Sequence, residues 1–125
     1  MTEASFAISY APGMRAVFTA LGLGPRVSGI EVRREGFLVR MGWGFRADIP
    51  RRAIFSIEPD DDRVTGWGVH GWGGRWLVNG SSSGLIRFRF DPPVPARAVG
   101  LPVQLEVLRI SVSDPEDLLR VLGRG

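Results

Sequence analysis

The sequence lacks cysteine and lysine altogether and contains a single histidine. Without cysteine the chain has no disulfide, no thiolate nucleophile and no thiolate metal ligand. Without lysine it has no Schiff-base lysine and no phosphate-binding P-loop lysine. A lone histidine is too few for a typical zinc site or for a well-supplied catalytic triad. We therefore expect no catalytic residue, no metal and no cofactor.

Long apolar runs are also missing. The longest one, at residues 16–23, is far shorter than the roughly 20 residues of a membrane-spanning helix. The N-terminal residues lack the basic and apolar regions of a secretory signal. We expect a cytoplasmic protein, and a length of 125 residues predicts one domain over residues 1–125.

The charge is only mildly positive, with 16 arginines against 13 acidic residues. Nucleic-acid-binding proteins usually carry a denser basic stripe, so we do not expect a nucleic acid partner. Arg87 and Arg89 alternate with apolar residues, as do Arg40 and Arg46, which predicts that all four lie on one outer sheet face. A solvated charged face is the simpler interpretation of this pattern, and peripheral binding to an anionic membrane is an alternative.

Residues 1–28 predict an N-terminal strand and a short helix. Phe6, Ile8 and Tyr10 alternate along residues 5–10, as in a strand with one buried face. Pro12 can begin a helix that Gly22 ends, with four apolar residues at helical spacing: Met14, Val17, Phe18 and Leu21. A strand is the alternative there, because Val17, Phe18 and Thr19 favour extended backbone.

Residues 29–112 carry strand-like alternation almost throughout. The pattern predicts seven antiparallel strands joined by short turns, at residues 30–33, 37–41, 45–49, 53–57, 75–78, 85–90 and 105–112. In the fourth strand we expect Ala53, Phe55 and Ile57 to face inward. Residues 58–62 are expected to form a solvated acidic turn. The proline-rich link at residues 91–95 is expected to lie outside the sheet, because proline donates no backbone hydrogen bond.

A change of parity after Val107 predicts a bulge in the last strand. The chain then predicts a helix over residues 113–123. Ser113 and Glu116 match a capping box and Pro115 suits the first turn. So short a helix must be held by packing of its leucines on the sheet.

Seven strands followed by one capped helix resemble the pleckstrin-homology-like (PH-like) superfold. More narrowly, the chain resembles the small PH-like proteins of actinobacteria in these segments: LGLGPR (21–26), RMGWGFR (40–46), IPR (49–51), GWGVHGW (66–72), RWLVNGS (75–81) and VSDPEDL (112–118). The resemblance implies an open barrel of two nearly orthogonal sheets over residues 29–112, plugged by the helix at 113–123, with residues 1–28 as an extension. It implies no particular activity. The turn at residues 33–36 is too short to wrap an inositol phosphate as the basic loop of many PH domains does.

The stretch from residue 66 to residue 84 combines three of the four tryptophans with the only histidine and seven glycines. Bulky indoles beside unrestricted backbone predict a shaped contact surface. We expect binding residues here and at one further tryptophan: Trp67, His70, Trp72, Arg75, Trp76, Asn79 and Trp43. The simpler interpretation of the tryptophans is that they pack in the core. The simpler interpretation of His70 is that it has a structural role.

This contact surface predicts a non-enzymatic binding or scaffold module that acts by protein–protein interaction or self-association. One alternative is a small-ligand barrel, or a weak enzyme, with His70, Arg75 and Asn79 as polar anchors at the barrel mouth. The other is the peripheral membrane protein already mentioned. The ligand and the partner are not specified by the sequence pattern.

Overall fold

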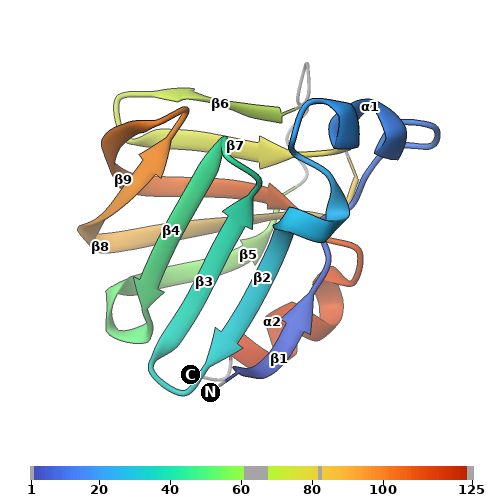
Figure 1. The fold of residues 1–125 in the computed structure, drawn as a ribbon. Coiled ribbons are helices and arrows are strands. Elements are labelled where there is room, and N and C mark those ends of the chain that lie inside the picture. The colour runs from blue at the N-terminus through green and yellow to red at the C-terminus, as the bar shows by residue number, and fades with distance from the viewer. Residues whose placement is uncertain (1, 61–67, 82, 124–125) are drawn as a thin grey trace.

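The computed structural model describes residues 2–60, 68–81 and 83–123, which form one sheet folded into two layers (Figure 1). Its nine strands are β1 (Thr2–Phe6), β2 (Ser28–Arg33), β3 (Gly36–Met41), β4 (Phe45–Pro50), β5 (Ile54–Pro59), β6 (Gly68–Trp72), β7 (Arg75–Asn79), β8 (Leu85–Ala98) and β9 (Leu101–Ser111). The helices are α1 (Arg15–Ala20) and α2 (Pro115–Gly123), with 3-10 turns η1 (Pro25–Val27) and η2 (Arg51–Ala53). The strand order is β1-β2-β3-β4-β8-β9-β7-β6, and β5 pairs with the other part of β8.

The first layer is the antiparallel meander that the alternation predicts. Strands β2 and β3 pair around residues 34–35, within the turn expected at residues 33–36, and β3 and β4 pair around the bend at residues 42–44. In β4, Ala47 and Ile49 are buried while Arg46 and Asp48 are exposed. Apolar alternation therefore defines both the strands and their inward faces here.

Strands β8 and β9 carry the sheet from one layer to the other. The first part of β8 pairs with β5, and its end pairs with β4 through Phe45 and Ala98. The β8–β9 register shifts between Arg89 and Val94. The predicted bulge after Val107 in the last strand is therefore wrong: Val107 and Leu108 pair in regular register, and the extra residues lie on β8.

The proline-rich link was expected to lie outside the sheet, and this expectation is wrong. Residues 91–95 belong to β8, and Val94 and Pro95 pair with Leu105 and Gln104. The strand tolerates these prolines because the first two fall where the β8–β9 pairing is interrupted, so no ladder hydrogen bond is required of them.

The expectation of an entirely antiparallel sheet is also wrong, because β7 and β9 run parallel. The long β8–β9 hairpin folds back so that β9 lies between β8 and β7. Strand β6 was not predicted, since three glycines interrupt its apolar pattern within residues 66–71. The structure therefore has more strands than the seven expected after residue 29, while the sheet stays open, with β1 and β6 at its two ends.

The core lies between the layers and is closed by α2. Phe37 of β3 and Phe88 of β8 are fully buried, with ring centroids 5.0 Å apart. Leu118 and Leu122 of α2 are also buried, so the predicted C-terminal helix packs as expected. Its cap is Asp114, whose carboxylate accepts a hydrogen bond from the Asp117 backbone N–H, rather than the predicted Ser113. The mainly β fold with a C-terminal helix is confirmed.

Three apolar side chains face outward against expectation. Phe55 is 72% exposed, because the pairing of β5 with β8 shifts register between Ile54 and Ser56 and turns Phe55 away from the core. The predicted helix is only the short α1, in which Phe18 alone is buried. Val17 in the helix and Leu21 just after it are exposed. The expected N-terminal strand is β1 followed by single bridges at Ile8 and Tyr10.

Among the described residues no helix combines the length and apolarity required to cross a membrane.

Candidate functional site

The outer face of the second layer carries two rows of side chains that cross the strands. Because alternate strand residues face the same side, the pairing register aligns one row as His70, Leu77, Arg109, Arg87 and Glu58. The neighbouring row contains Arg75, Val107, Arg89 and Ser56. Five strands thus bring together residues that lie far apart in the sequence.

These rows border a groove of about 300 Å³. We call it the arginine groove, and its lining includes His70, Arg75, Trp76, Arg87, Arg89 and Arg109. Leu77 and Val107 contribute apolar surface to the same lining. The groove therefore combines several guanidinium groups with apolar contact area, as protein interaction surfaces commonly do.

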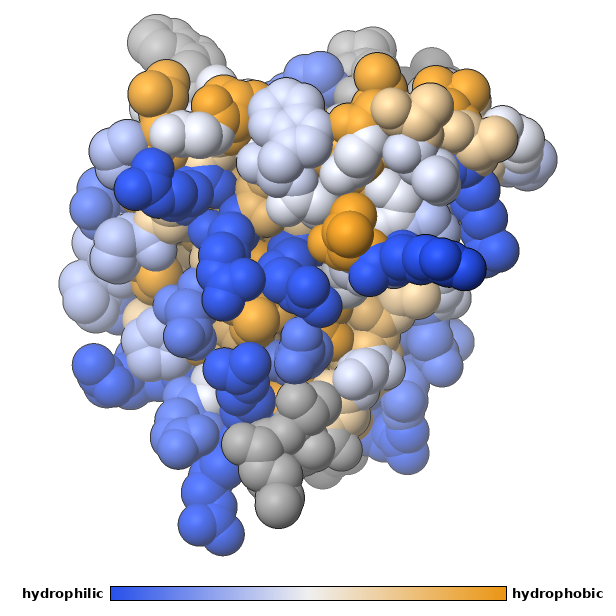
Figure 2. Space-filling view, viewed as in Figure 1, coloured by the Kyte–Doolittle hydropathy of each residue, from blue (hydrophilic) through white to orange (hydrophobic). Residues whose placement is uncertain are grey.

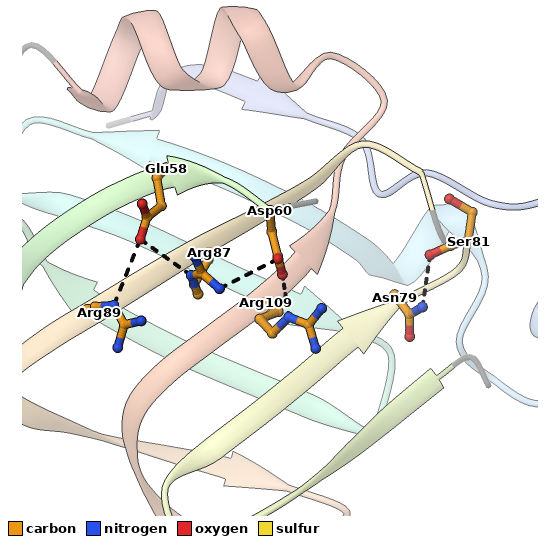
Figure 3. A network of polar contacts seen from close by, with 7 residues as sticks. All are labelled: Glu58, Asp60, Asn79, Ser81, Arg87, Arg89 and Arg109. Carbon is orange, nitrogen blue, oxygen red and sulfur yellow. Dashed lines mark hydrogen bonds and ion pairs between the residues drawn. The ribbon is translucent and has the colours of Figure 1, made fainter. Parts of the chain in front are cut away.

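Two carboxylates beside the groove hold three of its arginines (Figure 3). The Glu58 carboxylate lies 3.4 Å from Arg87 Nε and 3.8 Å from Arg89 Nε. The Asp60 carboxylate is fully buried, lies 3.6 Å from Arg87 Nη1 and also pairs with Arg109. A buried carboxylate requires such partners, and they in turn fix the guanidinium groups in place.

Asp60 therefore corrects the expectation of a solvated turn at residues 58–62. Its backbone N–H bonds to the Leu85 carbonyl, which holds it against β8. The sequence pattern of three consecutive aspartates resembles a solvated loop and gives no sign of this burial. Asp61 and Asp62 lie outside the described residues.

The groove keeps an excess of positive charge. It has four arginines against the two carboxylates of Glu58 and Asp60. Arg75 is exposed and makes no ion pair within the described part of the chain. An anionic group entering the groove would thus meet at least one guanidinium that no described carboxylate neutralises.

The structure brings only some of the expected binding residues together. His70 and Arg75, both exposed, join the groove with the half-buried Trp76. Asn79 is buried, and its side-chain Nδ2 donates to the Ser81 carbonyl at 2.8 Å (Figure 3). It therefore braces the turn after β7 and does not line the groove.

Of the remaining tryptophans, only Trp43 has a described side chain, and it is not among the residues that line the groove. Trp43 lies in the β3–β4 turn and its indole N–H donates to the Leu21 carbonyl. Trp67 is outside the described residues, and of Trp72 only the backbone, in β6, is described.

Sequence reasoning missed Glu58, Asp60 and Arg109 as members of this site. Arg109 alternates with buried neighbours in β9, which was sufficient to place it on an outer face. Only the parallel pairing of β9 with β7, however, brings it next to Leu77. No local pattern in the sequence predicts that pairing, because it joins strands separated by β8.

The four arginines expected on one outer face fall into two groups. Arg87 and Arg89 line the groove, whereas Arg40 and Arg46 are cross-strand neighbours in the first layer. Arg46 is also the cross-strand neighbour of Arg97, at the end of β8. Arg40 is paired with Glu31 at 3.1 Å.

Among the described residues, no group of three or more histidine, aspartate or glutamate side chains is arranged to hold a metal ion.

Burial raises the pKa of the Tyr10 hydroxyl. Its hydrogen bond with Ser28 and the charge of Arg15 reduce this effect.

No protein-family model, no curated protein and no solved structure matches this chain.

Proposed function

We propose that the protein is a non-enzymatic binding module that holds an acidic segment of a protein partner in the arginine groove. The observation that carries the proposal is the preassembled set of guanidinium groups from β8 and β9, held in place by Glu58 and Asp60, with Arg75 of β7 beside them in the same groove. Because these arginines are already ordered, a partner carboxylate binds them at a low cost in side-chain entropy.

A protein segment suits the groove better than other anions do. A volume of about 300 Å³ accommodates a few side chains, and Trp76, Leu77 and Val107 offer apolar contacts beside the charged groups. Strand β6 ends the sheet next to the groove, so an extended segment can also pair with its outer edge. Carboxylate recognition by Arg75 and Arg89 would then set the register of that segment.

We also infer that the fold is a variant of the PH-like open barrel, in a cytoplasmic protein. The support is an open, mainly β sheet in two layers with a C-terminal helix against β5. The chain differs from a seven-stranded antiparallel barrel by β6 and by the parallel pairing of β7 with β9. These two differences build the arginine groove.

The proposal is tested with a fluorescein-labelled peptide of alternating glutamate and tyrosine. We expect anisotropy to report saturable binding that Arg75→Glu together with Arg89→Glu weakens at least about a hundredfold, since each of the two lost charged contacts costs about 1.5 kcal/mol or more. The matched control is Arg34→Glu with Arg52→Glu, which changes the net charge equally at exposed positions, between β2 and β3 and in η2, that do not line the groove.

Equal weakening by both pairs of substitutions would mean that only net charge matters, and would refute a specific groove. Amide chemical-shift mapping adds a second measurement. The peptide should shift resonances of residues 69–71, 75–77, 87–89 and 107–109, and shifts confined to other residues would also refute the proposal.

A further inference from the structure

Exposed apolar side chains gather at one end of the molecule, away from α2. Among the described residues, seven large hydrophobic side chains are exposed, and all but Phe55 belong to three segments that meet around the β3–β4 turn. We call this set the Trp43 tip: Val17, Leu21, Val27, Trp43, Val99 and Leu101. In Figure 2 orange and pale atoms gather at the top of the view, over α1 and the β3–β4 turn.

The Trp43 tip has a fixed conformation, because hydrogen bonds join its segments to the β3–β4 turn. The Gly42 N–H donates to the Val27 carbonyl at 3.0 Å, and the Val99 N–H donates to the Gly44 carbonyl at 2.8 Å. The Trp43 indole N–H donates to the Leu21 carbonyl at 2.7 Å. An exposed indole is thereby held in a fixed position, with 64% of Trp43 facing outward.

Gly42 permits the close approach of these segments. Its φ is +52°, and a Cβ there would lie 1.8 Å from the Gly22 carbonyl oxygen. The backbone of the β3–β4 turn therefore contacts the segment after α1 directly, which only glycine allows.

The tip is bordered by arginines that make no ion pair with a described acidic residue. Arg15 and Arg26 border a groove of about 890 Å³ beside Val27, and Arg46 and Arg97 are neighbours just below the β3–β4 and β8–β9 turns. None of these four makes an ion pair with a described carboxylate. The segments that build this end, residues 7–30, 36–47 and 92–105, contain no aspartate or glutamate.

We propose that the Trp43 tip docks on the surface of an anionic phospholipid membrane. Tryptophan and aliphatic side chains at the tip would enter the interfacial region of the bilayer, where indoles are favoured. The four arginines would face the phosphate groups, and the segments that build the tip hold no carboxylate to repel those groups. No residue of the Trp43 tip lines the arginine groove, so substitutions can test the two surfaces separately.

A second copy of the chain suits the same surface less well. A two-fold interface would bring the tip of one copy against the tip of the other, and with it two sets of arginines without acidic partners. A lipid surface supplies the opposite charge, and its hydrocarbon needs no complementary shape. Charge complementarity therefore selects the membrane.

The test is co-sedimentation of the full chain with vesicles of equal parts phosphatidylcholine and phosphatidylglycerol. We expect binding that is lost on phosphatidylcholine alone and fades as salt is raised. Trp43→Ser should lower the vesicle partition coefficient about tenfold. Arg46→Gln with Arg97→Gln should lower it about fivefold for each arginine.

Matched controls separate the tip from general effects. Phe55→Ser removes an exposed aromatic of similar accessibility far from the tip, and Arg34→Gln with Arg52→Gln removes two exposed arginines elsewhere. Neither control should change vesicle binding. Leu101→Ser, which breaks no side-chain hydrogen bond, repeats the apolar test should Trp43→Ser unfold the chain.

Three outcomes would overturn the proposal. One is a chain that does not sediment with anionic vesicles, and another is equal loss of binding in tip and control variants. The third is a dimer, detected by light scattering, that Trp43→Ser or Leu101→Ser converts to a monomer. That result would assign the tip to self-association.

Discussion

At the scale of single residues, Tyr10 links the N-terminal segment to the segment that leads into the Trp43 tip. Its hydroxyl donates to the Leu23 carbonyl at 2.7 Å, and its ring contacts that of Phe18 edge to face at 5.2 Å. Tyr10 also forms a backbone bridge with Gly80, after β7. The half-buried Tyr10 side chain thus holds in place the segment that leads into the Trp43 tip.

The raised pKa of Tyr10 predicts a pH dependence of stability. The folded state holds the phenol proton more tightly than the unfolded state does, so this contribution to stability is full below the ordinary tyrosine pKa. It is lost as pH rises through the higher pKa of the folded protein. We expect the free energy of unfolding in urea to fall above about pH 10, the unfolded value.

Tyr10→Phe is the control for that dependence. It should cost about 1 kcal/mol at neutral pH, through the lost hydrogen bond. The variant should also flatten the decline in alkaline solution, since no other tyrosine is present. An unchanged slope between pH 9 and pH 11 would show that other groups cause it.

At the scale of elements, the β8–β9 hairpin connects both proposed surfaces. It contributes Arg87, Arg89 and Arg109 to the groove, and its turn contributes Val99 to the Trp43 tip. In the turn, Val99 and Gly100 both have positive φ, of 45° and 81°. This geometry favours Asn-Gly and disfavours a β-branched residue such as valine. An apolar residue is thus kept at the tip at some cost in stability.

Val99→Asn should therefore stabilise the protein and weaken membrane docking together. We expect a gain of about 1 kcal/mol in the free energy of unfolding, because asparagine tolerates this turn conformation. Vesicle binding should decrease, because apolar surface is lost from the tip.

Leu101→Asn separates the two effects, since it removes exposed apolar surface outside the two turn positions. It should weaken vesicle binding without any gain in stability. A Val99→Asn protein that is less stable than the parent would contradict the inference that Val99 strains the turn.

At the scale of the whole molecule, the fold of the sheet creates one surface at its Trp43 end and another on the outer face of its second layer. Local alternation was sufficient to predict the strands of the first layer, the outward arginines of β8 and the apolar face of α2. It could not predict where the sheet bends. The burial of Asp60 and the exposure of Phe55 both depend on pairing with β8, which lies far along the chain.

The candidate site was predictable only in part for the same reason. His70, Arg75 and Trp76 belong to one hairpin, so a pattern within residues 66–84 could identify them together. Arg109 and Glu58 reach the groove through pairings between distant strands. Trp43 was expected with the other tryptophans, yet its turn joins α1 and the β8–β9 turn instead.

The parallel pairing of β7 with β9 is the feature on which the arginine groove depends most directly. Nuclear Overhauser effects between strands, measured on the isotope-labelled full chain, test it. We predict contacts from residues 75–78 to residues 107–110 in parallel register, including Trp76 with Leu108. Contacts from residues 75–78 to residues 85–88 in an antiparallel hairpin would contradict that arrangement, because Arg75 and Arg109 would then belong to different surfaces.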